Sequence, residues 1–333
     1  MLYYDYSNLD QLLHKEGVTN FEPYILLQLG PPPLQLSESY IAAIKEAPFP
    51  ILSFTLVPIS GHPVRFPIWV LDYWRGIKHA TGYQQSWKSV LEWLSEISGS
   101  QLMVEICDQV MAGLSCFPWN GGNCTVCGMT SLLADSYLSD FHIDHTLAKI
   151  SHHHCDHYGV EVSKRHVFLT VLDLGSIIKA YKNGIHSACA SHKPKQLLEV
   201  ENRIISGYVD SVAEILHLPN HWTSLVITFK PPKILYGDSL GSSILSNKAS
   251  SLQQWICHMP DQSGHGIMES DISVYSLPTT IQKDAFSCGL IAPNAISHHY
   301  LPQTSPLLQP NPLSVAHCRL EFALDLLQDD AVS

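Results

Sequence analysis

Cys288 is the residue whose surroundings most favour nucleophilic chemistry. It is followed by Gly289 and by an apolar run that reaches Tyr300, so a buried helix is predicted to begin at the thiol. A helix N-terminus carries unpaired N–H groups and a partial positive charge, and both lower the pKa of a cysteine placed there. Six residues earlier, the side-chain amide of Gln282 could donate to a developing oxyanion. A small core cysteine is the alternative interpretation of the same octapeptide.

An imidazole and a carboxylate are predicted to lie at one end of a β-hairpin. His221 opens a strand-like run that ends at Phe229, and a second short strand, 234–236, follows a Lys-Pro-Pro-Lys turn. Asp238 comes soon after that strand, so pairing the two strands places His221 and Asp238 at the same end. Thiol, imidazole and orienting carboxylate are the catalytic groups of cysteine hydrolases. A turn aspartate in Gly-Asp-Ser is the alternative for Asp238.

These residues, in this order, resemble the ubiquitin-like-protease family, the SUMO (sentrin) deconjugating cysteine peptidases related to adenoviral protease. Four matches surround the chemical groups themselves: His221-Trp222, Asp238-Ser239, Gln282 and Ser287-Cys288-Gly289. A fifth lies upstream, where residues 137–144 are similar to the family's W-L-(N/S)-D-x-x-I-N helix start. Tyr137 replaces the family's tryptophan there, and Asp144 replaces its last asparagine. The resemblance covers the chain from near residue 132 to the C-terminus.

The resemblance implies an α+β fold: a papain-like or adenain-like cysteine protease domain with a central mixed sheet and flanking helices. It implies a cysteine-type isopeptidase or endopeptidase that cleaves after the C-terminal Gly-Gly of a small, SUMO-like ubiquitin-like modifier. Catalysis would fall to His221, Asp238, Cys288 and Gln282, without a cofactor. Trp222 and Tyr137 would bind the modifier's tail; for Trp222 the alternative is a core tryptophan at a strand start.

Two other functions share the same residues. A pseudoprotease would keep the fold and bind a ubiquitin-like modifier without turnover. An acyltransferase on the same triad would need sites for coenzyme A and a polyanion, and a chain with 19 Lys and Arg offers little for them.

Composition limits the partners. The 333 residues are 45% hydrophobic and 15% charged, which is typical of a globular chain. A net charge of −11 argues against nucleic acid, because phosphate neutralisation needs clustered Lys and Arg. The sequence contains neither an 18-residue apolar run nor a signal-peptide pattern, so no membrane span is expected. Nine cysteines are then most simply reduced thiols of an intracellular protein, nuclear or cytoplasmic. The oligomeric state is left open.

Two domains are predicted: residues 1–125, mainly helical and of unknown function, and residues 126–330, the peptidase. In the first, helices are expected at 37–46, 66–77, 83–97 and 101–114 and a strand at 51–57. In the second, helices are expected at 132–151, 177–186, 250–259 and 288–300, with strands at 167–173, 214–218 and 272–277 beside the hairpin. Ser314 is expected to cap the last helix.

One group of cysteines and histidines is compatible with a zinc site, with solvated histidines and loop cysteines as the alternative. Cys124 and Cys127 precede the pair His142 and His145, an arrangement that zinc fingers use. The histidine spacing is one residue shorter than usual, and both histidines fall within an expected helix. We therefore expect no metal.

Overall fold

The computed structural model describes residues 4–5, 13–14, 53–58, 64–67, 69–97, 101–116, 126–181, 195–259 and 268–332. The chain divides into two compact units, residues 1–89 and 90–333. The second unit begins earlier than the predicted peptidase domain, and it includes α4 (Gln101–Cys116), which packs on α12 (Pro312–Val332). The functional boundary between residues 125 and 126 stays a prediction.

The described residues of the first unit form four short strands: β1 (Tyr4–Asp5), β2 (Leu13–His14), β3 (Ser53–Pro58) and β4 (Val64–Pro67). β3 pairs antiparallel with the other three and falls where a strand was predicted. The two helices expected at 66–77 and 83–97 are one continuous helix, α3 (Trp69–Ile97), and Phe66 lies in β4. Gly76 and Gly82 do not interrupt α3, because each helical glycine costs only about 1 kcal/mol. The helix expected at 37–46 lies outside the described residues.

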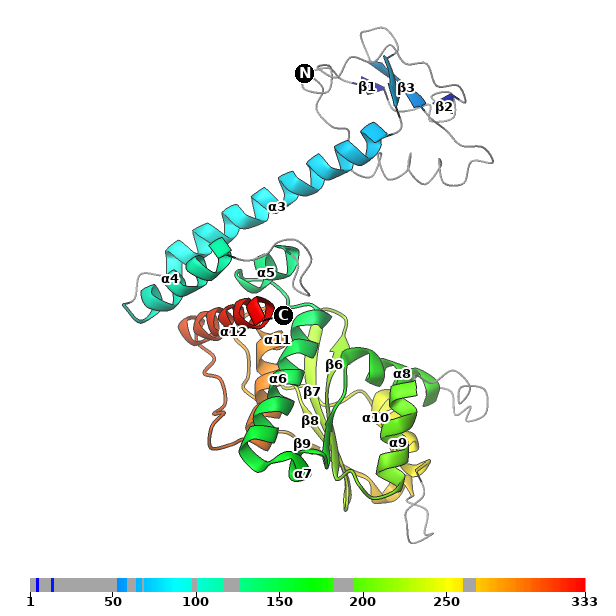
Figure 1. Cartoon of the computed structure of the whole chain (residues 1–333). Coiled ribbons are helices and arrows are strands. Elements are labelled where there is room, and N and C mark those ends of the chain that lie inside the picture. The colour runs from blue at the N-terminus through cyan, green and yellow to red at the C-terminus, as the bar shows by residue number, and fades with distance from the viewer. Residues whose placement is uncertain are drawn as a thin grey trace. The chain divides into compact units, whose positions relative to one another are not determined.

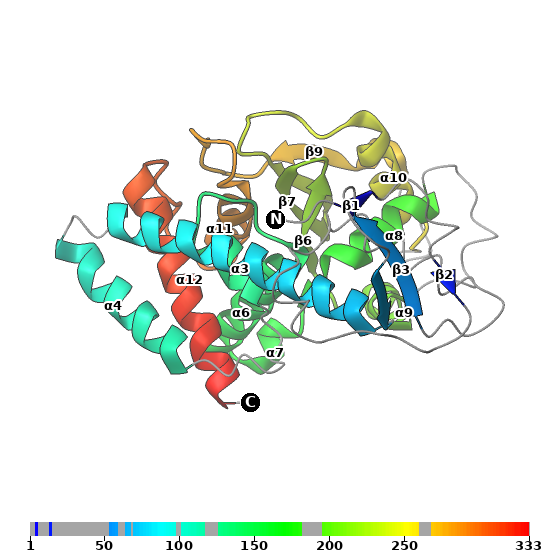
Figure 2. The ribbon, with the colours of Figure 1, turned by 90° about the horizontal axis from the view of Figure 1, so that it is seen from above.

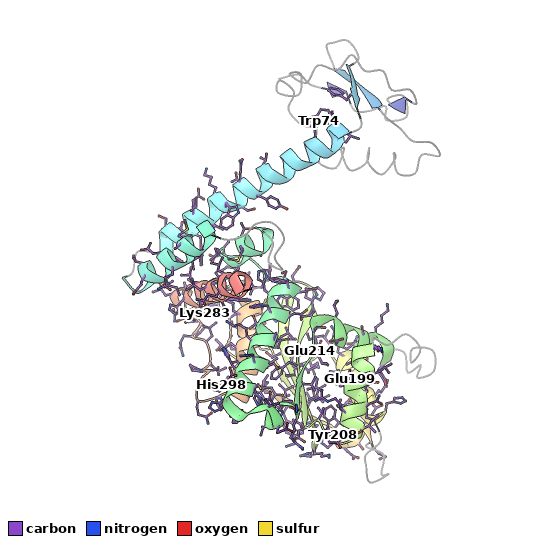
Figure 3. All side chains as sticks on the ribbon, in the orientation of Figure 1. Trp74, Glu199, Tyr208, Glu214, Lys283 and His298 are labelled. Carbon is purple, nitrogen blue, oxygen red and sulfur yellow. The ribbon has the colours of Figure 1, made fainter. Side chains whose placement is uncertain are left out.

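A five-stranded mixed sheet forms the centre of the second unit (Figure 1). Its order is β5 (His166–Phe168), β6 (Ser211–Leu218), β7 (His221–Phe229), β8 (Pro232–Gly237) and β9 (Ser273–Ser276). β6, β7 and β8 are antiparallel, as the predicted hairpin requires, and the two edge strands pair in parallel. The middle strand, β7, is buried along almost its whole length. Glu214 in the neighbouring strand β6, labelled in Figure 3, is also buried.

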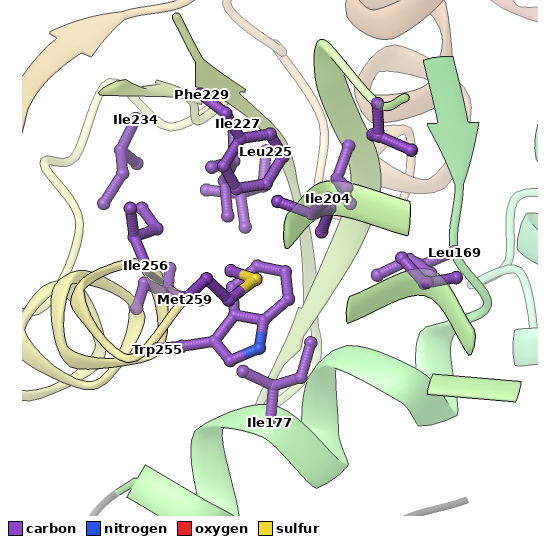
Figure 4. Packing of buried hydrophobic residues seen from close by; sticks show 14 of the residues in the cluster. Leu169, Ile177, Ile204, Leu225, Ile227, Phe229, Ile234, Trp255, Ile256 and Met259 are labelled. Carbon is purple, nitrogen blue, oxygen red and sulfur yellow. The ribbon is translucent and has the colours of Figure 1, made fainter. Parts of the chain in front are cut away.

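Helices cover both faces of this sheet (Figures 1 and 2). One layer contains α6 (Asp140–Tyr158), α11 (Cys288–Tyr300) and α12, and α11 packs on β7. The other contains α8 (Val171–Tyr181), α9 (Lys195–Ile205) and α10 (Ser246–Cys257). Between that second layer and the sheet lies an apolar cluster centred on the fully buried Trp255 (Figure 4). The described part of the chain contains no helix with the length and apolarity of a transmembrane segment.

Capping residues explain why several helix boundaries differ from prediction. The helix expected at 132–151 is two helices, α5 (Val126–Leu132) and α6, separated by residues 133–139. Ser139 and His142 form a reciprocal capping box at the start of α6. α12 begins at Pro312, and Asn311 is its cap, because Asn311 Oδ1 accepts the N–H of Ser314 at 2.9 Å. Ser314, the predicted cap, lies inside that helix.

The predicted strand 167–173 is also divided. β5 ends at Phe168 and α8 begins at Val171, whose N–H donates to Asp144 Oδ1 at 2.8 Å. Asp144, the departure from the family pattern, therefore helps to cap α8. α10, β9 and α11 lie close to their predicted positions. α8 begins six residues before the helix expected at 177–186, and α9 was not predicted.

Candidate active site

The hairpin β7–β8 brings His221 and Asp238 together as predicted. Thr223 lies across the hairpin from Asp238 by extension of the register, and His221 is two residues away on the same face. His221 Nε2 lies 2.7 Å from Asp238 Oδ1, and both side chains are almost fully buried. Because this bond uses Nε2, the other ring nitrogen, Nδ1, is the one left for a proton transfer.

Asp238 also fulfils the alternative interpretation of a turn aspartate. Its Oδ1 accepts the backbone N–H of Leu240 at 2.8 Å, so the carboxylate fixes the turn and the imidazole with one oxygen. Gly237 is required just before it, because a Cβ there would lie 2.2 Å from Thr279 Oγ1. The turn at Asp238 therefore needs a residue without a Cβ immediately before it.

Cys288 is the first residue of α11, as predicted, and it is fully buried. The preceding turn is fixed by Asp284, whose Oδ1 accepts the N–H groups of Phe286 and Ser287 at 2.9 and 2.7 Å. Asp284, three residues before Ser287, is a sequence signal for this Asx turn that the sequence analysis did not use. The bond from Ser224 Oγ to the carbonyl of Ala292 fastens α11 to β7 at 2.9 Å.

The protonation of Cys288 differs from expectation. Burial raises the pKa of its thiol, and this outweighs the lowering by the backbone N–H groups of Trp222, Gly289 and Cys288 itself; Asp284 adds to the rise. The predicted lowering of the cysteine pKa is therefore wrong for this structure, because Cys288 is fully buried and Asp284 lies near it. The backbone N–H of Trp222, next to His221 in the chain, is among the groups that lower the pKa of the thiol, so this end of the hairpin lies close to Cys288.

Gln282 is tied to the turn that carries Asp238. Its backbone N–H donates to the carbonyl of Ser239 at 2.9 Å, and its Oε1 accepts from Ser239 Oγ at 2.7 Å. Its Nε2 donates one hydrogen to the carbonyl of Asp284 at 2.9 Å. These bonds fix the orientation of the half-buried amide and leave the second Nε2 hydrogen available as a donor.

Trp222 and Tyr137 are brought close together through Leu138. Trp222 is only 4% exposed, and its Nε1 donates to the carbonyl of Leu138 at 3.0 Å. Tyr137 is 46% exposed and lies on the segment that precedes α6. Leu138 also packs on Gly289, where a Cβ would come within 2.9 Å of Leu138 Cβ. The close approach explains the glycine after the thiol.

The zinc arrangement does not form on the histidine side. His142 is buried, and both of its ring nitrogens are used: Nδ1 accepts from Ser139 N at 3.1 Å, and Nε2 lies 3.1 Å from the carbonyl of Gly128. The side chains of Cys124 and Cys127 lie outside the described residues. Within the described ranges, no three His, Cys, Asp or Glu side chains are grouped in a way that could hold a metal ion.

Solved structures with a similar fold include SUMO proteases. No family model and no curated protein matches the sequence. SUMO protease Ulp1 with its catalytic cysteine oxidised to a sulfonic acid is 18% identical over 68% of this chain and 95% of that chain, with a TM-score of 0.50. Ulp1 with the corresponding sulfinic acid is 18% identical over 67% and 94%, with a TM-score of 0.49. The Ulp1 protease domain in complex with Smt3, the yeast ortholog of SUMO, is 18% identical over 68% and 95%, with a TM-score of 0.47.

The chain therefore has the fold of the ubiquitin-like proteases. The predicted fold class, an α+β domain with a mixed central sheet and flanking helices, is confirmed. The roles of the individual site residues are inferred from their geometry below.

Proposed function

We propose that the protein is a cysteine peptidase that cleaves after the C-terminal Gly-Gly of a ubiquitin-like modifier. The observation that carries the proposal is the bond between His221 Nε2 and Asp238 Oδ1, at 2.7 Å, beside a helix that begins at Cys288. His221 is a buried imidazole that a carboxylate orients, and the backbone N–H of the next residue, Trp222, lies close enough to Cys288 to lower its pKa. This arrangement suits general-base activation of the thiol.

In the proposed reaction, His221 Nδ1 takes the proton from Cys288, while Asp238 holds the imidazole in one tautomer. The thiolate attacks the carbonyl of the modifier's last glycine. The free hydrogen on Gln282 Nε2 and the N–H of Cys288 donate to the oxyanion. His221 then protonates the leaving lysine amine, and water hydrolyses the thioester and frees the enzyme.

The raised pKa of Cys288 determines how this thiol would react. A thiol with a raised pKa is neutral near pH 7, so little thiolate exists before the substrate arrives. Proton transfer to His221 must then accompany attack, in contrast to enzymes that hold a preformed thiolate–imidazolium pair. The proposal is therefore general-base catalysis by His221 at the moment of attack.

The modifier's tail is assigned to the segment around Tyr137. Tyr137 is exposed, and its neighbour Leu138 contacts both the Trp222 indole and the first turn of α11. A tail that passes between Tyr137 and Trp222 would meet aromatic surfaces close to the thiol, where only residues without a Cβ fit. Substrates ending in Gly-Ala should then be cleaved about 10²-fold less efficiently than those ending in Gly-Gly.

A binding protein without turnover is the second candidate. It is favoured by the full burial of Cys288 and by the raised pKa of its thiol, because a buried neutral thiol is a poor nucleophile. Such a protein would grip the modifier with the same surface and release it unchanged.

Covalent capture separates the two candidates. The protein should be incubated with SUMO and ubiquitin probes that carry a C-terminal vinyl sulfone, and the adduct site read by mass spectrometry. Attachment of one modifier at Cys288, lost in Cys288→Ala and retained in Cys155→Ser at a half-buried free thiol, supports the peptidase. Binding of a modifier without capture by any probe would favour the binding protein and refute the proposed catalysis.

A further inference from the structure

A fully buried arginine joins the C-terminal helix to the segments beside the thiol. Arg319 lies in α12 and has no exposed surface. Its Nη1 donates to the carbonyls of Ser131 and Leu132 at 3.2 and 3.0 Å, and its Nη2 donates to the carbonyl of Ser136 at 2.7 Å. Ser131 and Leu132 are the last residues of α5, where unpaired carbonyls and the negative end of the helix favour a cation.

The same guanidinium contacts the segment that leads into α11. Arg319 Cζ lies 5.4 Å from the centroid of the Phe286 ring, within cation–π range. Phe286 is two residues before Cys288, and its N–H is held by Asp284. Lys283, labelled in Figure 3, is the residue that precedes Asp284. One side chain therefore contacts both the 131–136 segment and the 284–288 segment.

Packing alone is a poor explanation for this arginine. Burial lowers the pKa of Arg319 to about 10, against the charges of Asp135 and Asp284, so the side chain is still cationic at pH 7. Its Nε has no hydrogen-bond partner among the described residues. A buried charge with an unused donor is costly, and an apolar side chain of similar volume is often neutral or stabilising in such a place.

We propose that Arg319 is a positioning residue for the reaction at Cys288. Its planar fork fixes the 131–136 segment, which leads to Tyr137 and Leu138, against the Phe286 turn that leads to the thiol. This inference rests on the proposed peptidase function, because it assigns Arg319 the task of aligning the tail-binding segment with the nucleophile. Leu138 completes the connection through its contact with Gly289 and its carbonyl bond to Trp222.

The test compares Arg319→Lys with a matched exposed control, Arg165→Lys. Lysine keeps the charge but cannot bond three carbonyls with a rigid fork. Arg165 is an exposed partner of Asp210, so its replacement should leave the site unchanged. The readouts are the urea unfolding midpoint, the rate at which iodoacetamide alkylates Cys288 at pH 8, followed by mass spectrometry, and kcat and KM with a modifier carrying a C-terminal fluorogenic amide.

In folded Arg319→Lys, we expect alkylation of Cys288 to become at least about fivefold faster, because a thiol buried in the wild type becomes accessible. We expect kcat to fall on the order of tenfold or more, with a smaller change in KM, because misplacement near 1 Å already costs about 10²-fold. Alkylation and kcat both within twofold of wild type would overturn the proposal.

A second variant protects the test if Arg319→Lys does not fold. Phe286→Leu removes the aromatic ring beside the guanidinium but leaves the bonds from Arg319 to the three carbonyls. As in Arg319→Lys, alkylation of Cys288 should become faster and kcat should fall. An unchanged alkylation rate in folded Phe286→Leu would then overturn the positioning role. Because alkylation needs no modifier, it tests Arg319 even if no probe is captured and the peptidase proposal fails.

Discussion

The bond between His221 and Asp238 makes the carboxylate's identity testable at the level of one atom. In Asp238→Asn, the amide oxygen can still accept the N–H of Leu240, so the turn and the unfolding midpoint should change little. The same amide oxygen would also still accept from His221 Nε2, but a neutral amide cannot stabilise the imidazolium that forms when His221 takes the thiol proton. The carboxylate-to-amide change in serine proteases lowers kcat about 10⁴-fold. We expect a loss of kcat of that order in steady-state assays. A loss below about threefold would mean that another acid orients His221.

Gln282 has a natural control in its neighbour Ser239. Gln282→Ala should lower kcat by about 10²–10³, the usual effect of losing one oxyanion donor. Ser239→Ala removes the bond to Gln282 Oε1 but keeps the Nε2 donor, so its effect on kcat should be much smaller. If the two variants lost kcat equally, or if Gln282→Ala changed KM alone, Gln282 would hold the turn at Asp238 and would not be an oxyanion donor.

The raised pKa of Cys288 predicts an unusual pH dependence for the free enzyme. Only the thiolate reacts with iodoacetamide, so the alkylation rate should still be rising as pH passes 9, the ordinary thiol value. Peptide mapping by mass spectrometry distinguishes Cys288 from the other thiols. A rate that levels off below pH 7 would instead indicate a preformed thiolate, as first expected from the helix N-terminus.

At the level of elements, the start of α11 needs a glycine at position 289, because Leu138 packs directly against it. Gly289→Ala places a methyl group within 2.9 Å of Leu138 Cβ, so the segment carrying Tyr137 must move. We expect a loss of about 1–3 kcal/mol in the free energy of unfolding, typical of overpacking, together with reduced kcat/KM. Urea unfolding and steady-state kinetics measure the two effects.

Gly175→Ala is the matched control for that change. Gly175 is exposed in α8 and has open space where the Cβ would go. Replacement of a mid-helix glycine by alanine stabilises by about 0.5–1 kcal/mol, and Gly175 is remote from the site residues in sequence and element. If Gly289→Ala were as harmless as Gly175→Ala, the close packing of Leu138 on α11 would not be needed for activity.

At the level of the whole molecule, the sequence predicted what depends on local order and missed what depends on distant contacts. The hairpin and the α11 start were predictable, because strand pairing and turn residues specify them locally. Tyr137 was placed in a helix, although Ser139 and the helix-start pattern at 137–144 are local signals that a helix begins there. The break at 133–139 also depends on a distant contact, because Arg319 donates to the carbonyl of Ser136 from 183 residues further on. Asp144 caps a helix 27 residues away, so its role also required the fold.

Buried histidines on α6 predict how the whole second unit responds to acid. Burial is the main cause that lowers the pKa of His142 to about 4, helped by Arg319 and His145 and opposed by the bond to Gly128. The pKa of His154, buried beside His166 and His157, is lowered for the same main reason. Because the unfolded chain binds these protons first, stability is complete above about pH 6.5 and falls as pH drops towards 4.

At about 1.36 kcal/mol per pKa unit, His142 alone accounts for roughly 3 kcal/mol of that loss. Urea unfolding at pH 7 and pH 5 should therefore show a clear drop in the free energy of unfolding for the wild type. His142→Gln, which cannot take up a proton, should lower stability at pH 7 but reduce the difference between the two pH values. His153→Gln, at an exposed position of the same helix, should keep the wild-type difference. If His142→Gln also keeps it, the acid sensitivity must arise from other groups, with His154 and its neighbour His166 the next to replace.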